Sequence, residues 1–207
     1  MKRNLLNTLL ISVVLSGCNF ISTTNDKELI NSDISTAQKQ IEHQVQLIES
    51  SGKFLNPRTV YDNKVMYIPM DDWTSGFFPG TMWLMYDLTE DNKWKEYGVK
   101  YTEQLDSVKN LKWHHDVGFM IGCSYGNAYR ITKNEAYKNV IIETAKSLST
   151  RFRPVAGITQ SWNVDKGWQA TRGWMCPVII DNMMNLELLF KASDYSGNPL
   201  FRKIAIS

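Results

Sequence analysis

The feature that most constrains this chain is a pair of helices joined by a turn, a pattern that recurs three times. Residues 75–86 and 117–129 are uncharged stretches, and each is followed by a turn and an amphipathic helix. Thr132 has the same place in the second turn as Thr89 has in the first, 43 residues earlier. A third copy begins at Pro177. Self-similarity at about this period is typical of stacked helical hairpins, so we predict an all-α fold.

Each copy carries an aspartate near the start of its apolar helix. These residues lie 17, 16 and 15 positions before the turn of their own copy, and they are Asp72, Asp116 and Asp181. An aspartate in a first helical turn can simply satisfy free backbone N–H groups, which is the alternative for Asp181. If the hairpins curve into a ring, the three helix ends face one cleft. Carboxylates that share a cleft suit general acid/base chemistry on a sugar.

Two other segments complete the expected domain. Apolar residues at helical spacing predict a lead helix over 34–48, with Ser32 or Asp33 as its cap and Gly52 after its end. Residues 151–175 show no helix or strand period and contain three tryptophans, so we expect a loop over the cleft. Its tryptophans either stack on sugar rings or close one end of a helical barrel.

The N-terminus has the pattern of a bacterial lipoprotein signal. Basic residues are followed by a short apolar run and then by Leu15-Ser16-Gly17-Cys18. This order predicts cleavage before Cys18 and lipidation of that residue. We therefore expect a signal peptide over 1–18, a flexible tether over 19–33 and a domain over 34–207. The expected location is the cell envelope, with the protein attached to a membrane by its lipid.

Charge and cysteine usage narrow the function further. Without Lys2 and Arg3 the chain has 21 basic and 21 acidic side chains, which gives no indication of nucleic-acid binding. Cys123 and Cys176 lie in apolar helical contexts and are expected to be free thiols. The three histidines have no recognisable ligand spacing, so we expect neither a metal nor a cofactor.

Two aspartate-centred stretches resemble the unsaturated glucuronyl hydrolases, glycoside hydrolase family 88. They are Trp113-His114-His115-Asp116-Val117-Gly118-Phe119-Met120 and the run from Val178 to Glu187, VIIDNMMNLE. The stretches Asp72 to Gly80, DWTSGFFPG, and Ser124 to Asn127 add to the resemblance. The resemblance implies an (α/α)6 toroid. It also implies removal of a 4,5-unsaturated uronic acid from the non-reducing end of oligosaccharides made by polysaccharide lyases, the glycosaminoglycan type above all.

The same resemblance implies roles for individual residues. Asp181 is expected to protonate C4 of the sugar and to position the water that adds at C5. Asp116 is expected to be the second catalytic carboxylate. The expected substrate contacts are His115, Trp73, Trp162 and Asn182. Desolvation by the apolar residues around Asp181, together with the charge of Asp116, is expected to raise the pKa of Asp181, whereas the helix N-terminus opposes that shift.

The length of the chain is a departure from the family. Six hairpins need roughly 350 to 400 residues, and this chain supplies a lead helix, two hairpins and part of a third. The family's other half carries residues that bind the uronate carboxylate and the next sugar. We therefore expect a half toroid with an apolar open side. Two alternatives are a non-catalytic glycan-binding lipoprotein and a related hydrolase acting on pectin fragments.

Overall fold

The structure is a computed structural model that describes residues 23–207, and these described residues separate into two compact units divided between Leu47 and Ile48. The expected signal peptide and lipidated Cys18 lie outside the described residues. Helix α2 (Thr23–Ser50) contains the predicted lead helix, but it begins well before Ser32. The expected tether is therefore helical from Thr23 onward. The reason is that no glycine or proline interrupts residues 23–50. Gly52, with φ of +63°, follows its end as predicted.

The second unit begins with a β-hairpin that the sequence indicated only as an extended segment. Strands β1 (Asn56–Tyr61) and β2 (Lys64–Ile68) pair antiparallel, with Tyr61 opposite Lys64. The two turn residues, Asp62 and Asn63, have φ values of 46° and 56°. Aspartate and asparagine tolerate this left-handed conformation better than most residues, which explains the tight turn.

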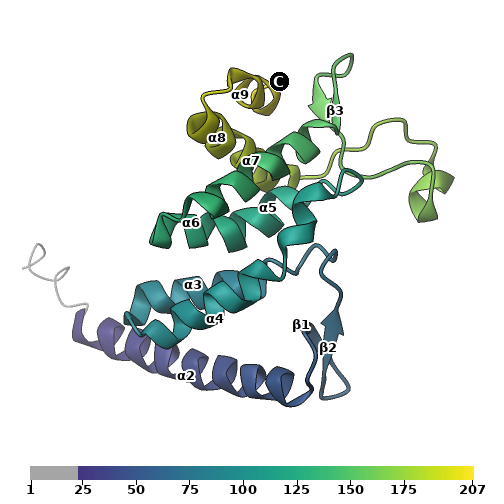
Figure 1. The fold of residues 1–207 in the computed structure, drawn as a ribbon. Coiled ribbons are helices and arrows are strands. Elements are labelled where there is room, and N and C mark those ends of the chain that lie inside the picture. Colours follow the sequence, from purple (N-terminus) through teal and green to yellow (C-terminus); the bar gives the residue numbers. More distant parts are fainter. Residues whose placement is uncertain (1–22) are drawn as a thin grey trace, which may run out of the picture. The chain divides into compact units, whose positions relative to one another are not determined.

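Three helical pairs follow the hairpin, as the repeat predicts (Figure 1). The first pair is α3 (Phe77–Thr89) with α4 (Asn92–Glu103). The second combines α7 (Glu135–Ser149) with a helix made of α5 (Val117–Ile121), a π-helical turn (Gly122–Gly126) and α6 (Asn127–Thr132). The third is α8 (Asn182–Ser196) with α9 (Pro199–Ala205). Short 3-10 helices (Asp106–Asn110 and Gly167–Arg172) and a small hairpin, β3 (Phe152–Arg153) with β4 (Ile158–Thr159), lie in the connections.

The same hydrogen bonds build the turn within each pair. A hydroxyl residue ends the first helix, the next residue is left-handed, and an Asp or Asn then caps the second helix. The three sets are Thr89-Glu90-Asp91, Thr132-Lys133-Asn134 and Ser196-Gly197-Asn198. Each hydroxyl donates to the carbonyl four residues earlier and accepts from the backbone N–H of its cap residue. This repeated chemistry explains why the turn was recognisable in the sequence.

The hydrophobic core includes side chains from all three helical pairs. Trp83 is fully buried and donates its indole N–H to Thr102 at 2.9 Å. Gly98 leaves space for that ring, since a Cβ there would lie 2.8 Å from it.

Cys123 and Cys176 are free thiols, as predicted. Among the described residues, no helix is both long and apolar enough to cross a membrane.

Helix α8 leaves much of its apolar surface exposed. Met183 and Met184 are 68% and 48% exposed, and the neighbouring Ile180 is 89% exposed. The pattern of this stretch suggested a helix that is apolar on all sides and buried. The exposure agrees with the expectation of an open apolar side at the end of a helical stack.

A carboxylate pair between the first residues of α5 and α8

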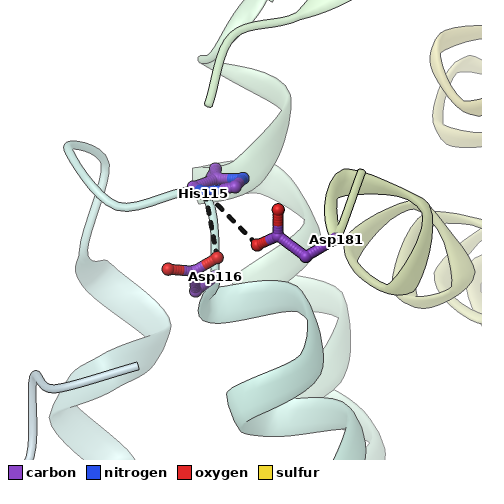
Figure 2. A group of neighbouring side chains, drawn as sticks. All are labelled: His115, Asp116 and Asp181. Atoms are coloured by element: carbon purple, nitrogen blue, oxygen red, sulfur yellow. Dashed lines mark ion pairs between the residues drawn. The ribbon is translucent and has the colours of Figure 1, made fainter. Parts of the chain in front are cut away.

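Asp116 and Asp181 occupy equivalent positions, since each immediately precedes a helix of the predicted inner set. Asp116 precedes α5 and Asp181 precedes α8. Neither side chain caps its helix, so the alternative of a simple capping aspartate does not hold for Asp181. The structure brings the two carboxylates to one place, as the spacing predicted, and His115 lies beside both of them (Figure 2).

The helix α8 is shorter at its N-terminus than expected. Pro177 was placed in its first turn, but α8 begins at Asn182. The carbonyl of Pro177 instead accepts the backbone N–H of Ser161, and the N–H of Ile179 donates to the Ser161 hydroxyl. These bonds fix the chain just before Asp181 against the loop and hold it out of the helix.

His115 is the buried centre of the site, with 1% of its surface exposed. Its Nε2 atom lies 2.9 Å from Asp116 Oδ1 and 3.7 Å from Asp181 Oδ2. These contacts are electrostatic, because neither His115 Nε2 nor Asp116 Oδ1 has a hydrogen-bond partner of normal geometry. Such deep burial leaves the ring little surface for a substrate, so the structure favours a role toward the two carboxylates over the expected sugar contact.

The two carboxyl groups have opposite pKa shifts. Burial, a hydrogen bond with Asp116 and the charge of Asp116 raise the pKa of Asp181, although His115 opposes the shift. Burial also acts to raise the pKa of Asp116, but His115, His114 and Asp181 together outweigh it and hold this pKa below its usual range. Environments that separate two carboxyl pKa values assign one group as acid and the other as anion.

The pKa of Asp181 is raised, as the sequence predicted, but the apolar neighbours that were expected to raise it are not the cause. Ile180, Met183 and Met184 are exposed and provide little desolvation. Asp181 Oδ1 is nevertheless buried, while Oδ2 faces His115, so the carboxyl group itself is partly desolvated.

An open cavity of about 370 Å³ lies beside His115 and Asp116. This volume is within the range of small-ligand sites. Its lining combines aromatic rings with polar groups from three segments: Trp73, Trp113, His114, His115, Asp116, Ser161, Trp162, Asn163, Lys166, Gly167 and Gln169. Asp181 is not among the lining residues and adjoins this wall through His115 and Asp116. The loop after α7 therefore lines the cavity, as expected from its lack of periodicity.

Both tryptophans that the sequence singled out line this cavity. Trp73 is 44% exposed and contacts Phe77 and Phe119 edge-to-face. Trp162 packs with Trp168 and Trp174 at ring-centroid distances of 5.0 and 6.0 Å. The rings thus serve partly as packing for the loop and partly as cavity wall.

Asn182 and Asp72 do not join the carboxylate pair. Asn182 is 5% exposed, lies away from this cavity and donates its amide to the Thr159 carbonyl at 2.9 Å. It therefore fastens α8 to β4 and does not line the cavity beside the carboxylate pair. Asp72 pairs with Arg58 at 3.0 Å and binds the backbone and hydroxyl of Thr74. Only two of the three aspartates in register reach the site.

Sequence reasoning missed Arg151, which holds the cavity loop in place. Arg151 is 2% exposed, and its guanidinium group donates to the carbonyls of Gln160, Ser161 and Lys112 and to the side chain of Asn163. A lone arginine at the end of an amphipathic helix gives no sequence signal for such a role. Asn185 was also missed, although its place one helical turn after Asp181 was a signal.

The three groups of the site are close enough to touch one cation. The ligand atoms of His115, Asp116 and Asp181 all lie within 4.8 Å of one another. Imidazole binds a metal ion only through an unprotonated ring nitrogen. The tautomer of His115 therefore decides whether this donor set fits a metal.

Stacked helical hairpins, a carboxyl pair with opposed pKa shifts and a tryptophan-lined cavity are together the features expected of a carbohydrate-active site on a helical-hairpin fold. No protein-family model matches the chain. An unsaturated glucuronyl hydrolase from Formosa agariphila is 36% identical over 182 residues, which cover 87% of this chain and 44% of that protein. One from Bacillus sp. strain GL1 is 35% identical over 69% of this chain and 38% of that protein.

Solved structures agree with these relatives. An unsaturated glucuronyl hydrolase specific for heparin matches with a TM-score of 0.68 and 38% identity. The match covers 78% of this chain and 43% of the enzyme's chain. The enzyme from Streptococcus agalactiae matches 86% of this chain with a TM-score of 0.73 and 26% identity, again over 43% of its own chain. The chain is thus homologous to the unsaturated glucuronyl hydrolases and spans less than half the length of these relatives.

Proposed function

We propose that this chain belongs to a hydrolase that removes a 4,5-unsaturated uronic acid from the non-reducing end of an oligosaccharide. The single observation that carries the proposal is the pair Asp116 and Asp181, with an ionised group beside a group whose pKa is raised. Protonation of a C4=C5 enol ether requires an acid that keeps its proton near neutral pH. Homology to glycoside hydrolases that act on such sugars supports the same substrate class.

In the proposed reaction, Asp181 donates its proton to C4 while a water molecule adds to C5. The Asp181 carboxylate takes a proton from that water, so the net change is the addition of one water molecule across the double bond. The C5 hemiketal then opens by cleavage of its ring C–O bond, and C1 releases the neighbouring sugar. Asp116 stays ionised and orients the water or a sugar hydroxyl.

The distance between the carboxylates argues against direct displacement with inversion. Inverting glycosidases keep their two carboxyl groups about 6.5 to 9.5 Å apart to admit a water molecule between them. Here the site atoms lie within 4.8 Å of one another, which leaves no such space. Trp73 and Trp162 are the proposed stacking surfaces for the sugar rings. Lys166 also lines the cavity and provides a positive charge there.

The test follows the ultraviolet absorbance of unsaturated chondroitin and heparin disaccharides in the presence of the protein. Loss of absorbance reports loss of the conjugated double bond. We expect Asp181→Asn to lower the rate by at least about 100-fold, the scale of a lost general acid. Asp194→Asn makes the same change at an exposed residue paired with Arg202 and is expected to keep the wild-type rate.

Two outcomes contradict the proposal for this chain acting alone. If the folded wild type binds the disaccharides without any loss of absorbance, the chain is a glycan-binding protein. If it neither binds nor reacts, the residues contributed by the remaining length of the relatives are required. Faster reaction with unsaturated pectin disaccharides than with either glycosaminoglycan would instead assign the substrate to the pectin class.

We also propose that the protein is attached to the outer or inner envelope membrane through lipidated Cys18. The support is the sequence of the first 18 residues alone.

A further inference from the structure

We propose that Asn185 is a positioning residue that fixes the tautomer of His115, so that the ring holds a proton toward Asp116 and Asp181. Its consequence for catalysis rests on the proposed function. The tautomer itself follows from hydrogen bonds among buried groups.

The orientation of the Asn185 amide is set by a group that can act only as a donor. The backbone N–H of Phe119 lies 3.0 Å from Asn185 Oδ1, and a backbone N–H cannot accept. The atom that faces Phe119 must therefore be the amide oxygen, which places the amide nitrogen on the other side. Asn185 is 0% exposed, so water does not compete for these positions.

The amide nitrogen has two hydrogens and two neighbours. One neighbour is the backbone carbonyl of Asp181 at 3.5 Å, and the other is Nδ1 of His115 at 3.4 Å. Because the amide nitrogen only donates, Nδ1 must be the acceptor and is unprotonated in the neutral ring. The ring proton is then on Nε2.

Nε2, which holds the ring proton, is the nitrogen that lies beside the carboxylate pair, and its contact with the carboxylates is electrostatic. Nε2 lies 2.9 Å from Asp116 Oδ1 and 3.7 Å from Asp181 Oδ2 (Figure 2). The opposite tautomer would turn an N–H toward the N–H group of Asn185. That contact would be repulsive, so Asn185 selects the tautomer of the ring.

This tautomer has two consequences for the site. The Nε2–H dipole stabilises negative charge on Asp116 and on Asp181 after that residue has given up its proton. It also leaves Nε2 without a lone pair, so His115, Asp116 and Asp181 do not form a metal site, although their atoms are close enough. Asn185 therefore makes this cluster an acid/base site and not a cation site, without touching the substrate.

The test is nuclear magnetic resonance of the full chain labelled with ¹⁵N at the histidine rings. The chain has three histidines, which keeps the assignment simple, and His43→Gln removes one of them on the exposed helix α2. The spectrum is recorded at about pH 8, above the usual histidine pKa, where neutral rings show their tautomer through one protonated and one unprotonated nitrogen. We expect Nδ1 of His115 to be unprotonated and Nε2 to be protonated.

Asn185→Asp tests the cause of this preference. The carboxylate still accepts from Phe119 but now presents an oxygen to Nδ1, so we expect the His115 proton to move to Nδ1 or both nitrogens to be protonated. Asn127→Asp makes the same change beside Arg130, outside the His115 cluster, and is expected to leave the pattern unchanged. Should Asn185→Asp not fold, Asn185→Leu adds no buried charge and is expected to give a mixture of tautomers.

A wild-type ring with its proton on Nδ1 would overturn the proposal without any variant. An Nε2-protonated ring in the wild type that persists in the folded Asn185 variants would overturn the role of Asn185. The measurement needs no turnover, so its result is independent of whether the proposed hydrolase activity is found.

Discussion

Gly118 lies where α5 packs directly against Asn185 of α8, and a single added methyl group there would push Asp116 and Asp181 apart. A Cβ atom at Gly118 would lie 2.5 Å from Cα, 2.6 Å from Oδ1 and 2.8 Å from Cβ of Asn185. The first of these atoms belongs to the backbone of α8, so a side-chain rotation cannot relieve the contact. Ordinary contact begins at 3.4 Å, which means that α5 and α8 must move apart by about 0.9 Å for Gly118→Ala to fit.

The expected cost is the difference between two opposing effects. Replacing a helical glycine with alanine favours the helix by up to about 1 kcal/mol. Forcing an additional carbon into a closely packed contact costs about 1–3 kcal/mol, and here backbone must shift as well. We therefore expect Gly118→Ala to lower the free energy of unfolding by about 1–2 kcal/mol. A displacement near 1 Å between Asp116 and Asp181 is also expected to lower the rate by about 10- to 100-fold if the chain is active.

Gly122 provides the matched control on the same stretch of helix. Its backbone is helical, with φ of −58° and ψ of −44°, and a Cβ there meets no atom within 4 Å. Gly122→Ala is expected to keep or raise the stability, by up to about 1 kcal/mol. The assay is urea unfolding of both variants, followed by circular dichroism. If Gly118→Ala is as stable as Gly122→Ala, the close approach of α5 to Asn185 is not a constraint and the reasoning is refuted.

Three other predictions concern Arg151, Asp181 and Cys18. Arg151→Met leaves several buried carbonyl acceptors unpaired and is expected to cost about 2–4 kcal/mol in urea unfolding; a cost below about 1 kcal/mol would contradict its role in holding the loop. The raised pKa of Asp181 means that the folded state binds this proton more tightly than the unfolded state does, so this group stabilises the fold as the pH falls from the raised value toward 3.8. Asp181→Asn should therefore be more stable than the wild type near about pH 7, with a difference that shrinks toward about pH 4; an opposite trend in urea unfolding would show that the pKa is not raised. Cys18→Ala is expected to release the protein from the membrane fraction and to abolish incorporation of labelled fatty acid, and an unchanged distribution would exclude lipidation at this residue.

The helical pairs were predictable because their signals are local. Each turn is closed by a hydroxyl residue and an Asp or Asn two positions later, all of whose hydrogen bonds lie within a few residues. Predictions from local patterns were wrong at two helix starts. Residues 23–33 have the polar composition of a tether but contain no helix breaker, and Pro177 suits a first helical turn but is held by the loop through Ser161.

The candidate site was predictable in part for the same reason. The similar spacing of Asp116 and Asp181 from their turns, 16 and 15 residues, placed both at helix starts, and this register follows from sequence alone. The spacing placed Asp72 there equally well. Its side chain lies elsewhere because Arg58, 14 residues away on β1, pairs with it, a contact that no helical period encodes.

The sequence by itself determined the repeated helical pairs, the positions of their turns and the pair of carboxyl groups at equivalent helix starts. Only the tertiary structure decided the protonation states of those groups. The raised pKa of Asp181 depends on its distance from Asp116 and His115, and the tautomer of His115 depends on Asn185, which contacts Phe119 across 66 residues of chain. A short-range pattern fixes where a residue lies on its own helix. The protonation state of a buried group depends on neighbours that packing alone brings within a few ångströms.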